Sequence, residues 1–274
     1  MDLKGRQVLV TGAAAGIGLE CALAFAKHGA NLVISDINEA ALEEARARVA
    51  SLGARCLARV CDVASDSSVA AFASAVHEAA GPLDVLVNNA GVAFLGSFDE
   101  TPLTEWQRIY DINVLGIVRC TNAFLPAMRQ AGGERKIVNV ASAAGFTPLP
   151  NMSAYAASKH AVVGLSEVLA MELHETEVSV LVVCPGIINT AIVHVSATTP
   201  GISAAQIGRI QKYYADEGCH PSVVAEDIVR AVERDQGILF TGPGARAGYT
   251  AMRISRGMAR RFTLDVARKS GYLA

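Results

Sequence analysis

The sequence predicts an α/β fold in which helices cover both faces of a parallel β-sheet. Short β-branched apolar runs alternate with longer Ala-rich helical stretches along most of the 274 residues. These runs are apolar throughout, as strands buried on both faces are. The hydrophobic content of 51% is enough to form a sizeable core. Together these observations predict a doubly wound, Rossmann-type sheet of about seven strands.

The expected elements follow one another along the chain. Strands are expected at "QVLVTG", "NLVISD", "RCLARVCD", "DVLVNNAG", "KIVNVAS", "VSVLVVCPG" and "GILFTG". Helices are expected from Leu19, from Glu39 towards Leu52, and over 69–80, about 104–130 and 155–174. Because no Pro-, Gly- or Ser-rich linker divides residues 1–244, they are expected to form one domain. Within this domain, residues 187–220 should cover the substrate. Residues 245–274 should form a separate basic C-terminal extension.

Composition and spacing exclude several classes of protein. The net charge of −2 gives no reason to expect nucleic-acid binding. The six cysteines show neither CxxC nor zinc-type spacing, so they are interpreted as reduced thiols and no metal site is expected. The N-terminus lacks a signal-peptide pattern, and no apolar run is long enough to span a bilayer. These features predict a cytoplasmic protein.

The first predicted strand is followed by "TGAAAGIG", which ends just before the first helix. Gly12, Gly16 and Gly18 allow the backbone to turn tightly and to approach a ligand closely. The amino end of the helix adds free N–H groups and a positive dipole end, which favour a diphosphate. A plain tight turn is the alternative, but this position between strand and helix is the context of a dinucleotide site.

Acidic residues stand at the ends of the second and third predicted strands. At Asp36, a carboxylate can accept both ribose hydroxyls of an adenosine and repel a 2′-phosphate, which favours NAD over NADP. Alternatively, Asp36 caps the next helix, a role for which Asn38 competes. Asp62 can bind an adenine amino group while Val63 packs on the ring, and the alternative for both is an ordinary strand end.

Further motifs resemble those of the short-chain dehydrogenase/reductase family over roughly residues 5–240, in the family's order. "NNAG" at 88–91 resembles the fourth-strand motif, and Tyr155-Ala-Ala-Ser-Lys159 matches YxxxK. Ser142, thirteen residues before Tyr155, and Asn113 stand where the family has its catalytic Ser and Asn. The segment from "PG" to Thr190 resembles the nicotinamide-side loop. The resemblance implies an NAD-binding site formed by Gly12, Gly16, Ile17, Gly18, Asp36, Asp62, Val63, Asn89, Tyr155, Lys159, Pro185, Gly186, Ile188 and Thr190.

The resemblance also implies roles for four catalytic residues. Tyr155 takes the alcohol proton while hydride leaves for the nicotinamide, and in the reverse direction it protonates a carbonyl. Ser142 holds the substrate oxygen by hydrogen bonding. Asn113 supports a water chain that links Lys159 to solvent, and Lys159 also bonds the nicotinamide ribose.

The spacing of Tyr155 and Lys159 gives this motif a physical basis. On a helix, residues i and i+4 share a face, so both side chains should point into one cleft. A free tyrosine has a pKa near ~10 and is a poor base at neutral pH. Since a nearby ammonium favours the phenolate, we expect the pKa of Tyr155 to be lowered towards working pH.

The substrate pocket is expected to be apolar, because 187–220 carries few charges and apolar residues from two earlier segments join it. The expected lining is Phe94, Leu95, Phe146, Leu149, Met152, Ile192, Val193, Val195, Ile202, Ile207, Ile210, Tyr213 and Tyr214. This set predicts a hydrophobic secondary alcohol or ketone as the small substrate. His194 either contacts the substrate or, as we favour, is a partly exposed loop residue.

Residues 245–274 carry seven basic side chains and one acid, a net charge of +6 that leaves −8 for the rest of the chain. Ile254, Met258, Phe262 and Val266 recur at helical spacing and predict a basic amphipathic helix. Such a helix can lie on a membrane surface. It can also pack over the active site or on a partner subunit, with its arginines paired to the acidic body. We favour packing over membrane contact because the stripe is narrow and Gly257 weakens an isolated helix.

The leading functional hypothesis is an NAD-dependent alcohol dehydrogenase or ketone reductase. One alternative is a peripheral membrane-associated lipid or steroid dehydrogenase with the same chemistry. Another alternative is a noncatalytic NAD-binding sensor. The intact set of four catalytic residues argues against it. By resemblance, a homodimer is expected through the long fourth and fifth helices, and a homotetramer is also open.

Overall fold

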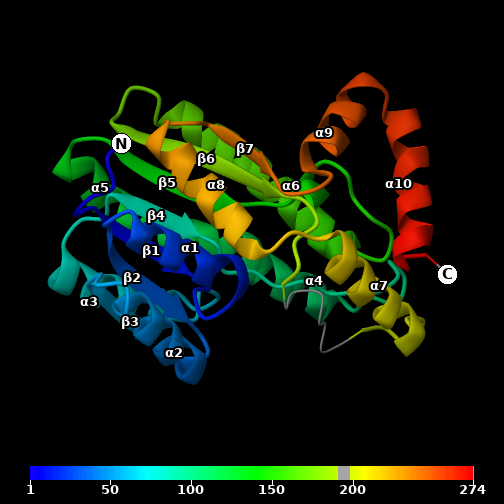
Figure 1. Cartoon of the computed structure of the whole chain (residues 1–274), viewed down its shortest axis with the longest axis horizontal. Helices are drawn as coiled ribbons and strands as arrows, with labels where there is room; N and C mark the ends of the chain where they lie inside the picture. Colours follow the sequence, from blue (N-terminus) through cyan, green and yellow to red (C-terminus); the bar gives the residue numbers. More distant parts are fainter. Residues whose placement is uncertain (191–197, 274) are drawn as a thin grey trace.

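A single sheet with helices on both faces forms the centre of the molecule (Figure 1). The computed structural model describes residues 1–190 and 198–273. Within them, seven strands follow the order β3-β2-β1-β4-β5-β6-β7, and each neighbouring pair is parallel. The strand order reverses between β1 and β4, so the two halves of the chain wind away from this point. The doubly wound Rossmann-type fold is therefore confirmed.

The strands agree with the predicted apolar runs to within a few residues. They are β1 (Gln7–Thr11), β2 (Asn31–Asp36), β3 (Cys56–Val60), β4 (Val85–Asn88), β5 (Arg135–Val140), β6 (Val178–Pro185) and β7 (Ile238–Thr241). Successive side chains enter opposite layers, because a strand alternates its side chains between faces. In β1, Val8 and Val10 pack in one core cluster and Leu9 in another. This two-sided burial is why the central strands are largely apolar, whereas the edge strands β3 and β7 are partly exposed.

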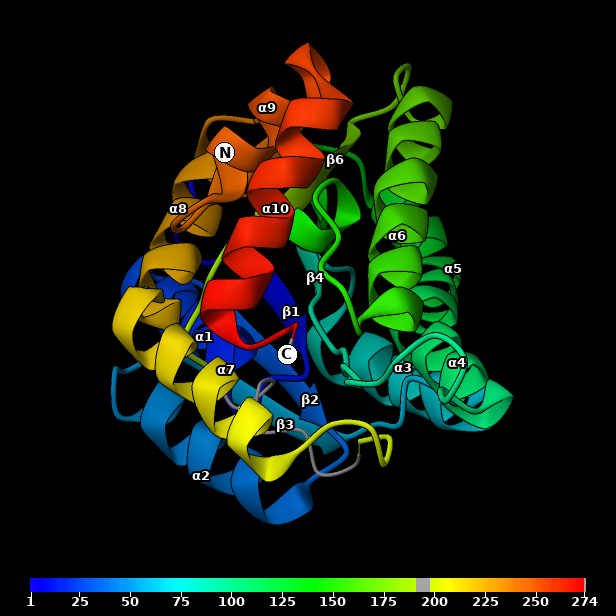
Figure 2. The ribbon, with the colours of Figure 1, turned by 90° about the vertical axis from the view of Figure 1, so that its right-hand side faces the viewer.

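Helices from the two halves of the chain cover the two faces of the sheet, as Figure 2 shows. One layer contains α1 (Gly16–Lys27), α2 (Glu39–Ala50) and α8 (Pro221–Glu233). The other contains α3 (Asp66–Ala80), α5 (Gly116–Ala131) and α6 (Ser153–Glu172). The remaining helices are α4 (Leu103–Tyr110), α7 (Ala204–Glu217), α9 (Ala245–Ile254) and α10 (Arg256–Ser270).

The predicted single helix over 104–130 is wrong in one respect. The structure divides it into α4, a π-helical turn at Asp111–Leu115, and α5. In the turn, the Asn113 side chain is fully buried and bonded to neighbouring segments. Wider helical turns of this kind frequently occur at functional sites. Apolar periodicity gives no signal for such a turn, since its cause is a tertiary contact.

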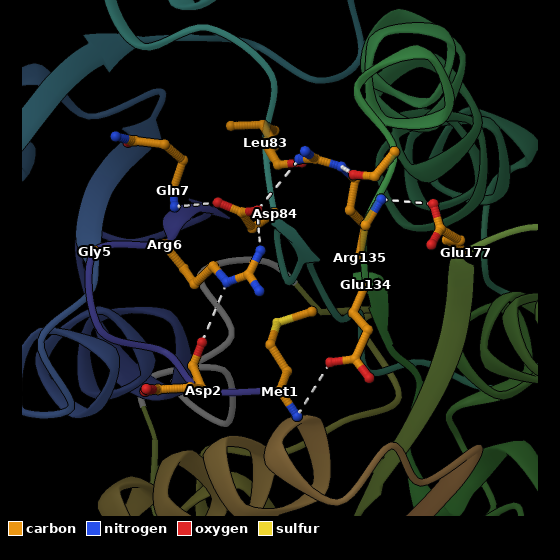
Figure 3. A network of polar contacts seen from close by, with 12 residues as sticks. Met1, Asp2, Gly5, Arg6, Gln7, Leu83, Asp84, Glu134, Arg135 and Glu177 are labelled. Carbon is orange, nitrogen blue, oxygen red and sulfur yellow. Dashed lines mark hydrogen bonds and ion pairs between the residues drawn. The ribbon is translucent and has the colours of Figure 1, made fainter.

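A polar network joins the amino ends of β1, β4 and β5, at the edge of the sheet opposite the site described below (Figure 3). The buried Asp84 carboxylate accepts hydrogen bonds from the Arg6 guanidinium at 2.9 Å and the Gln7 amide at 2.8 Å. The Arg135 guanidinium also donates to it, at 3.3 Å. Because Asp84 neutralises two partly buried arginines, its removal would leave both without their shared anion.

We therefore expect Asp84→Ala to lower the free energy of unfolding by about 3 kcal/mol, the typical cost of breaking a buried pair. The matched control is Asp66→Ala, since Asp66 also pairs with an arginine, Arg119, but its side chain is 86% exposed. An exposed pair contributes about 1 kcal/mol at most. Urea unfolding of both variants measures the difference, and equal losses would contradict the role assigned to the network.

Candidate active site

A cavity of about 660 Å³ lies at the carboxyl edge of the sheet. Its walls come from residues at or after the carboxyl ends of β1 to β7, from α6 and α7, and from the C-terminal helices α9 and α10. Parallel strands all present their carboxyl ends at this edge, and ligands of such sheets bind outside it where the strand order reverses. The position of the cavity is therefore a direct result of the topology.

The glycine turn after β1 forms one end of the cavity. Gly12 and Gly16 have φ values of +64° and +56°, which glycine adopts readily. At Gly18, a Cβ would collide with the Gly12 carbonyl oxygen, so the helix approaches the strand as closely as only glycine allows. Asn89 braces this turn, because its side-chain amide donates to the carbonyls of Thr11 and Gly12 at 3.0 and 3.1 Å.

Asp36 borders the cavity at the end of β2, beside the glycine turn. Its carboxylate accepts hydrogen bonds from the amides of Ala14 at 3.1 Å and Asn38 at 3.0 Å. Asn38, not Asp36, caps α2, since its side chain accepts from the Ala41 amide at 3.2 Å. Of the two alternatives for Asp36, helix capping is thus excluded, and the carboxylate is available at the cavity.

The other predicted cofactor residues also lie around this cavity. Asp62 and Val63 line it in the loop after β3, where the Asp62 carboxylate also accepts from the Ala64 amide at 2.9 Å. The remaining lining residues from the predicted set are Gly12, Gly16, Ile17, Asn89, Pro185, Gly186, Ile188 and Thr190. Gly18 does not border the cavity but allows the turn to form. The structure therefore brings this set together in one place.

Ser142, Tyr155 and Lys159 meet in the same cavity. Tyr155 and Lys159 stand one turn apart on α6, and the Lys159 Nζ lies 5.7 Å from the centre of the Tyr155 ring. Lys159 is only 4% exposed, and its Nζ donates to the Val140 carbonyl oxygen at 2.9 Å. Ser142 follows β5 and forms a hydrogen bond with Tyr155. A phenol, a hydroxyl and an amine thus share one site.

The expectation that Lys159 lowers the pKa of Tyr155 is not met in this structure. Burial raises the pKa of Tyr155 to about 12, and the hydrogen bond with Ser142 only partly opposes this effect. Burial also lowers the pKa of Lys159 to about 8. Desolvation penalises the charged form of both groups and is the largest cause of each shift. The phenol is therefore protonated at neutral pH in the absence of a ligand.

Asn113 joins three segments around this site. Its Oδ1 accepts from the Val92 amide at 2.8 Å, and its Nδ2 donates to the Val92 carbonyl and the Ser158 hydroxyl, both at 3.0 Å. A Cβ on Gly91 would lie 3.2 Å from the Asn113 Oδ1 and 3.6 Å from the Lys159 Nζ, so this glycine borders both groups. Asn113 positions α6, and its support of a water chain stays a prediction.

The substrate end of the cavity differs in part from the predicted lining. Leu95, Leu149, Met152, Ile210, Tyr213 and Tyr214 line it as predicted. Phe94 and Phe146 do not, because Phe94 packs on Ile109, and Phe146 meets the Tyr249 ring edge-on and the Phe240 ring at a tilt. Ile202 and Ile207 instead pack in a small core beneath α7. The predictions for Ile192, Val193, His194 and Val195 lie outside the described residues.

Sequence analysis missed Tyr272, whose buried side chain lines the cavity. Its hydroxyl lies 3.2 Å from that of Tyr214, and its carbonyl accepts from the Asn151 side chain at 2.7 Å. Gly271 ends α10 with φ +91°, and a Cβ there would lie 2.8 Å from the Arg209 Cβ. A glycine after a helical pattern is the one available signal that the chain turns back here.

The residues present fit a nicotinamide dinucleotide. α1 begins at the cavity, and its cap residue Ala15 supplies no side-chain acceptor, so the amino end of the helix can receive a diphosphate. The glycine turn lets a ligand approach the backbone, and Asp36 supplies a carboxylate for a ribose. Lys159 and Tyr155 stand at the other end. The fold and this site define a dinucleotide-binding oxidoreductase class of protein.

Comparison with known proteins identifies the family. The family model for short chain dehydrogenase matches residues 6–200, and the chain belongs to this family. Over 255 residues it is 40% identical to the probable oxidoreductase EphD of Mycobacterium tuberculosis, which covers 90% of this chain. The chain spans 43% of the length of that relative.

Solved structures share the fold over nearly the whole chain. A short chain dehydrogenase/reductase from Burkholderia phymatum in complex with NAD has a TM-score of 0.88 at 29% identity, covering 95% of this chain and 97% of its own. The L-sorbose reductase of Gluconobacter frateurii, complexed with NADPH and L-sorbose, has a TM-score of 0.76 at 28% identity, with coverages of 88% and 97%. The shared fold thus accompanies either cofactor.

The described residues also bear on membrane crossing and metal binding. Across 1–190 and 198–273, no helix combines the length and apolar character needed to cross a membrane. The same residues contain no group of three or more His, Cys, Asp or Glu side chains placed to hold a metal ion. All six cysteines are free thiols.

The lowered pKa of Lys159 predicts a pH dependence of stability. The folded protein releases this proton near pH 8, whereas the unfolded chain keeps it to about pH 10.5. Between these values the unfolded chain binds more protons, so the contribution of Lys159 to stability increases with pH. We expect the unfolding free energy of the native protein, minus that of Lys159→Met, to become more positive by about 2 kcal/mol from pH 8 to pH 10. Urea unfolding measures it, and a constant difference would contradict desolvation of Lys159.

Proposed function

We propose that the protein transfers a hydride between the nicotinamide of NAD and a small hydrophobic secondary alcohol or ketone. The observation that carries this proposal is that Ser142, Tyr155 and Lys159 line the same cavity as Asp36 and the glycine turn. A noncatalytic sensor would need only the part of the cavity that binds the nucleotide, formed by Asp36 and the glycine turn. The presence of a buried phenol and amine at the other end supports an enzyme, and a cytoplasmic location remains part of the proposal.

Preference for NAD is supported by the charges beside the glycine turn. The Asp36 carboxylate would accept hydrogen bonds from ribose hydroxyls and repel a 2′-phosphate. Among the described residues that line the cavity, Lys159 alone carries a basic side chain, and it stands beside Tyr155. A 2′-phosphate would therefore meet an anion and no cation at the Asp36 end. The exposed Ile37 beside it offers an apolar surface to an adenine.

The side chains at the other end can hold the substrate and exchange a proton with it. A bound nicotinamide dinucleotide would supply or accept the hydride. The Tyr155 phenol holds its proton at neutral pH, because burial raises its pKa to about 12, and it can pass that proton to the more basic oxygen that develops as a carbonyl receives the hydride. Ser142 can hold the same oxygen by hydrogen bonding. In alcohol oxidation, Tyr155 must first lose its proton, which the Lys159 ammonium and an oxidised nicotinamide both favour electrostatically.

The substrate class follows from the walls around these groups. The described side chains nearest the substrate end are apolar or phenolic, namely Leu95, Leu149, Met152, Ile210, Tyr213, Tyr214 and Tyr272. Such walls favour a largely apolar body and place few charges against it. We therefore propose a cyclic, aromatic or steroid-like secondary alcohol or its ketone.

Association of copies through the fourth and fifth predicted helices is part of the proposal. In the structure these correspond to α4–α5 and to α6. Leu115 and Val118 on one side, and Val168 and Met171 on the other, are between 39% and 63% exposed. Exposed apolar residues gathered on neighbouring helices are typical of interfaces. A homodimer is the simplest assembly, with a homotetramer as the alternative.

The proton-transfer role of Tyr155 is tested by Tyr155→Phe. We expect the turnover with a panel of hydrophobic secondary alcohols and ketones to fall by about 10²–10⁴-fold, the usual contribution of general acid–base catalysis. NADH absorbance follows the reaction, and calorimetric binding of NADH to the variant shows that the cofactor site is intact. Near-normal turnover in a folded variant would refute this role.

Cofactor choice is tested separately with Asp36→Ser. We expect kcat/KM to fall with NAD and to rise with NADP, because the anion that repels a 2′-phosphate is removed. The ratio of the two values should change by at least about tenfold. The matched control is Asp62→Ser, which removes another carboxylate from the cavity and should change both values in parallel. A native preference for NADP would overturn the role of Asp36.

A further inference from the structure

An exposed ridge of apolar side chains runs along the α9–α10 hairpin, which projects at one end of the molecule (Figure 1). It consists of Ile254, Met258 and Phe262, which are 78%, 71% and 67% exposed. Met258 and Phe262 lie on adjoining turns of α10, whereas Ile254 ends α9 on the other side of the extended residue Ser255, so the predicted helix through all three is divided there. The predicted apolar stripe therefore does not pack on the body, and of its members only Val266 is half-buried. We refer to these three residues as the hairpin ridge.

A different face of α10 holds the helix on the body. Ala259, Ala267 and Ser270 are buried, and Ala267 packs in a cluster with Leu95 and Ile210. Thr263 and Val266 line the cavity beside them. The prediction that the extension packs over the active site thus agrees with the structure, but the packing residues are not the predicted ones. The helix is fixed in place, and the hairpin ridge is left facing solvent.

The basic side chains around the ridge are also without acidic partners. The prediction that they pair with the acidic body is wrong, because within the described residues only Arg268 forms an ion pair, with Asp265 on its own helix. Arg253 instead lies over the Tyr249 ring, 5.8 Å from its centre. The exposed side chains without an acidic partner in the described part of the chain are Arg246, Arg253, Arg256, Arg260, Arg261 and Lys269.

We propose that the hairpin ridge and its surrounding arginines bind an anionic lipid bilayer. Apolar side chains that enter the headgroup region, with arginines beside them to contact phosphates, are the pattern of a helix lying in a membrane interface. A second copy of the chain fits this surface less well. A two-fold contact would place the same positive cluster against itself, with a net charge of +6 on each side. An anionic bilayer satisfies both the charge and the apolar surface.

The ridge also adjoins the cavity. Phe262 is largely exposed and yet lines the cavity, so it stands at the rim. A protein bound through the hairpin ridge would present this rim to the lipid. Apolar molecules that partition into the bilayer could then reach the cavity over a short path. This consequence rests on the proposed function, whereas binding to the bilayer does not.

The test is co-sedimentation of the full chain with vesicles of phosphatidylcholine alone or of phosphatidylcholine with an equal amount of phosphatidylglycerol. We expect binding to the anionic vesicles at low salt, and little binding to the neutral ones. Ile254→Ser combined with Met258→Ser should reduce the bound fraction at least fivefold. Arg256→Gln combined with Arg261→Gln should do the same and reduce the sensitivity to salt.

Matched controls come from exposed side chains elsewhere. Leu103→Ser with Leu52→Ser removes apolar groups that are 70% and 42% exposed, and should leave binding unchanged. Arg55→Gln with Arg234→Gln removes two exposed charges and should act likewise. Equal binding by ridge and control variants, or no binding by the native chain, would overturn the proposal. So would light scattering showing that the ridge variants split an assembly, because the occupant would then be a second copy. NADH binding to each variant checks the fold independently of turnover.

Discussion

All strands of the sheet run in one direction, and this constraint determines where chemistry can occur. Parallel strands present their carboxyl ends at one edge, and the chain departs from each of them in a loop. Gly12, Asp36, Asp62, Ser142 and Pro185 stand at or just after the carboxyl ends of different strands and are up to 173 residues apart in sequence, yet all border one cavity. The charge network around Asp84 joins the amino ends of the strands at the opposite edge. The carboxyl edge is left open for ligands.

Within the cavity, burial has a larger effect than the attraction between neighbouring groups. It raises the pKa of Tyr155 and lowers that of Lys159, so both neutral forms are favoured. Asn113 contributes by position, since its amide connects the loop after β4 to Ser158, whose hydroxyl donates to the Tyr155 carbonyl at 2.7 Å. The Tyr155 phenol is thus held in a preorganised site, where a bound cationic ring would lower its pKa.

The C-terminal extension has two faces with different surroundings. The face with Ala267 closes the cavity and brings Tyr272 beside Tyr214. The face with Met258 and Phe262 meets solvent among unpaired arginines. One helix therefore carries both a wall of the cavity and the surface proposed to meet a bilayer.

The sequence by itself determined the strand and helix order, the glycine turn, the carboxylate at Asp36 and the Tyr155–Lys159 pair. These depend on local spacing, which periodicity and residue type record directly. Only the tertiary structure decided that Asn38 and not Asp36 caps α2, that a π-helical turn interrupts the helix at Asn113, and that Tyr272 reaches the cavity. It also decided which face of α10 is buried and that the chain breaks at Ser255, because the four-residue spacing of Met258 and Phe262 marks a shared face without showing what covers it. The turn at Asn113, the position of Tyr272 and the buried face of α10 depend on contacts between segments far apart in the chain, and local sequence carries no record of the partner. The Asn38 cap is local, but residue type alone left two candidates for it.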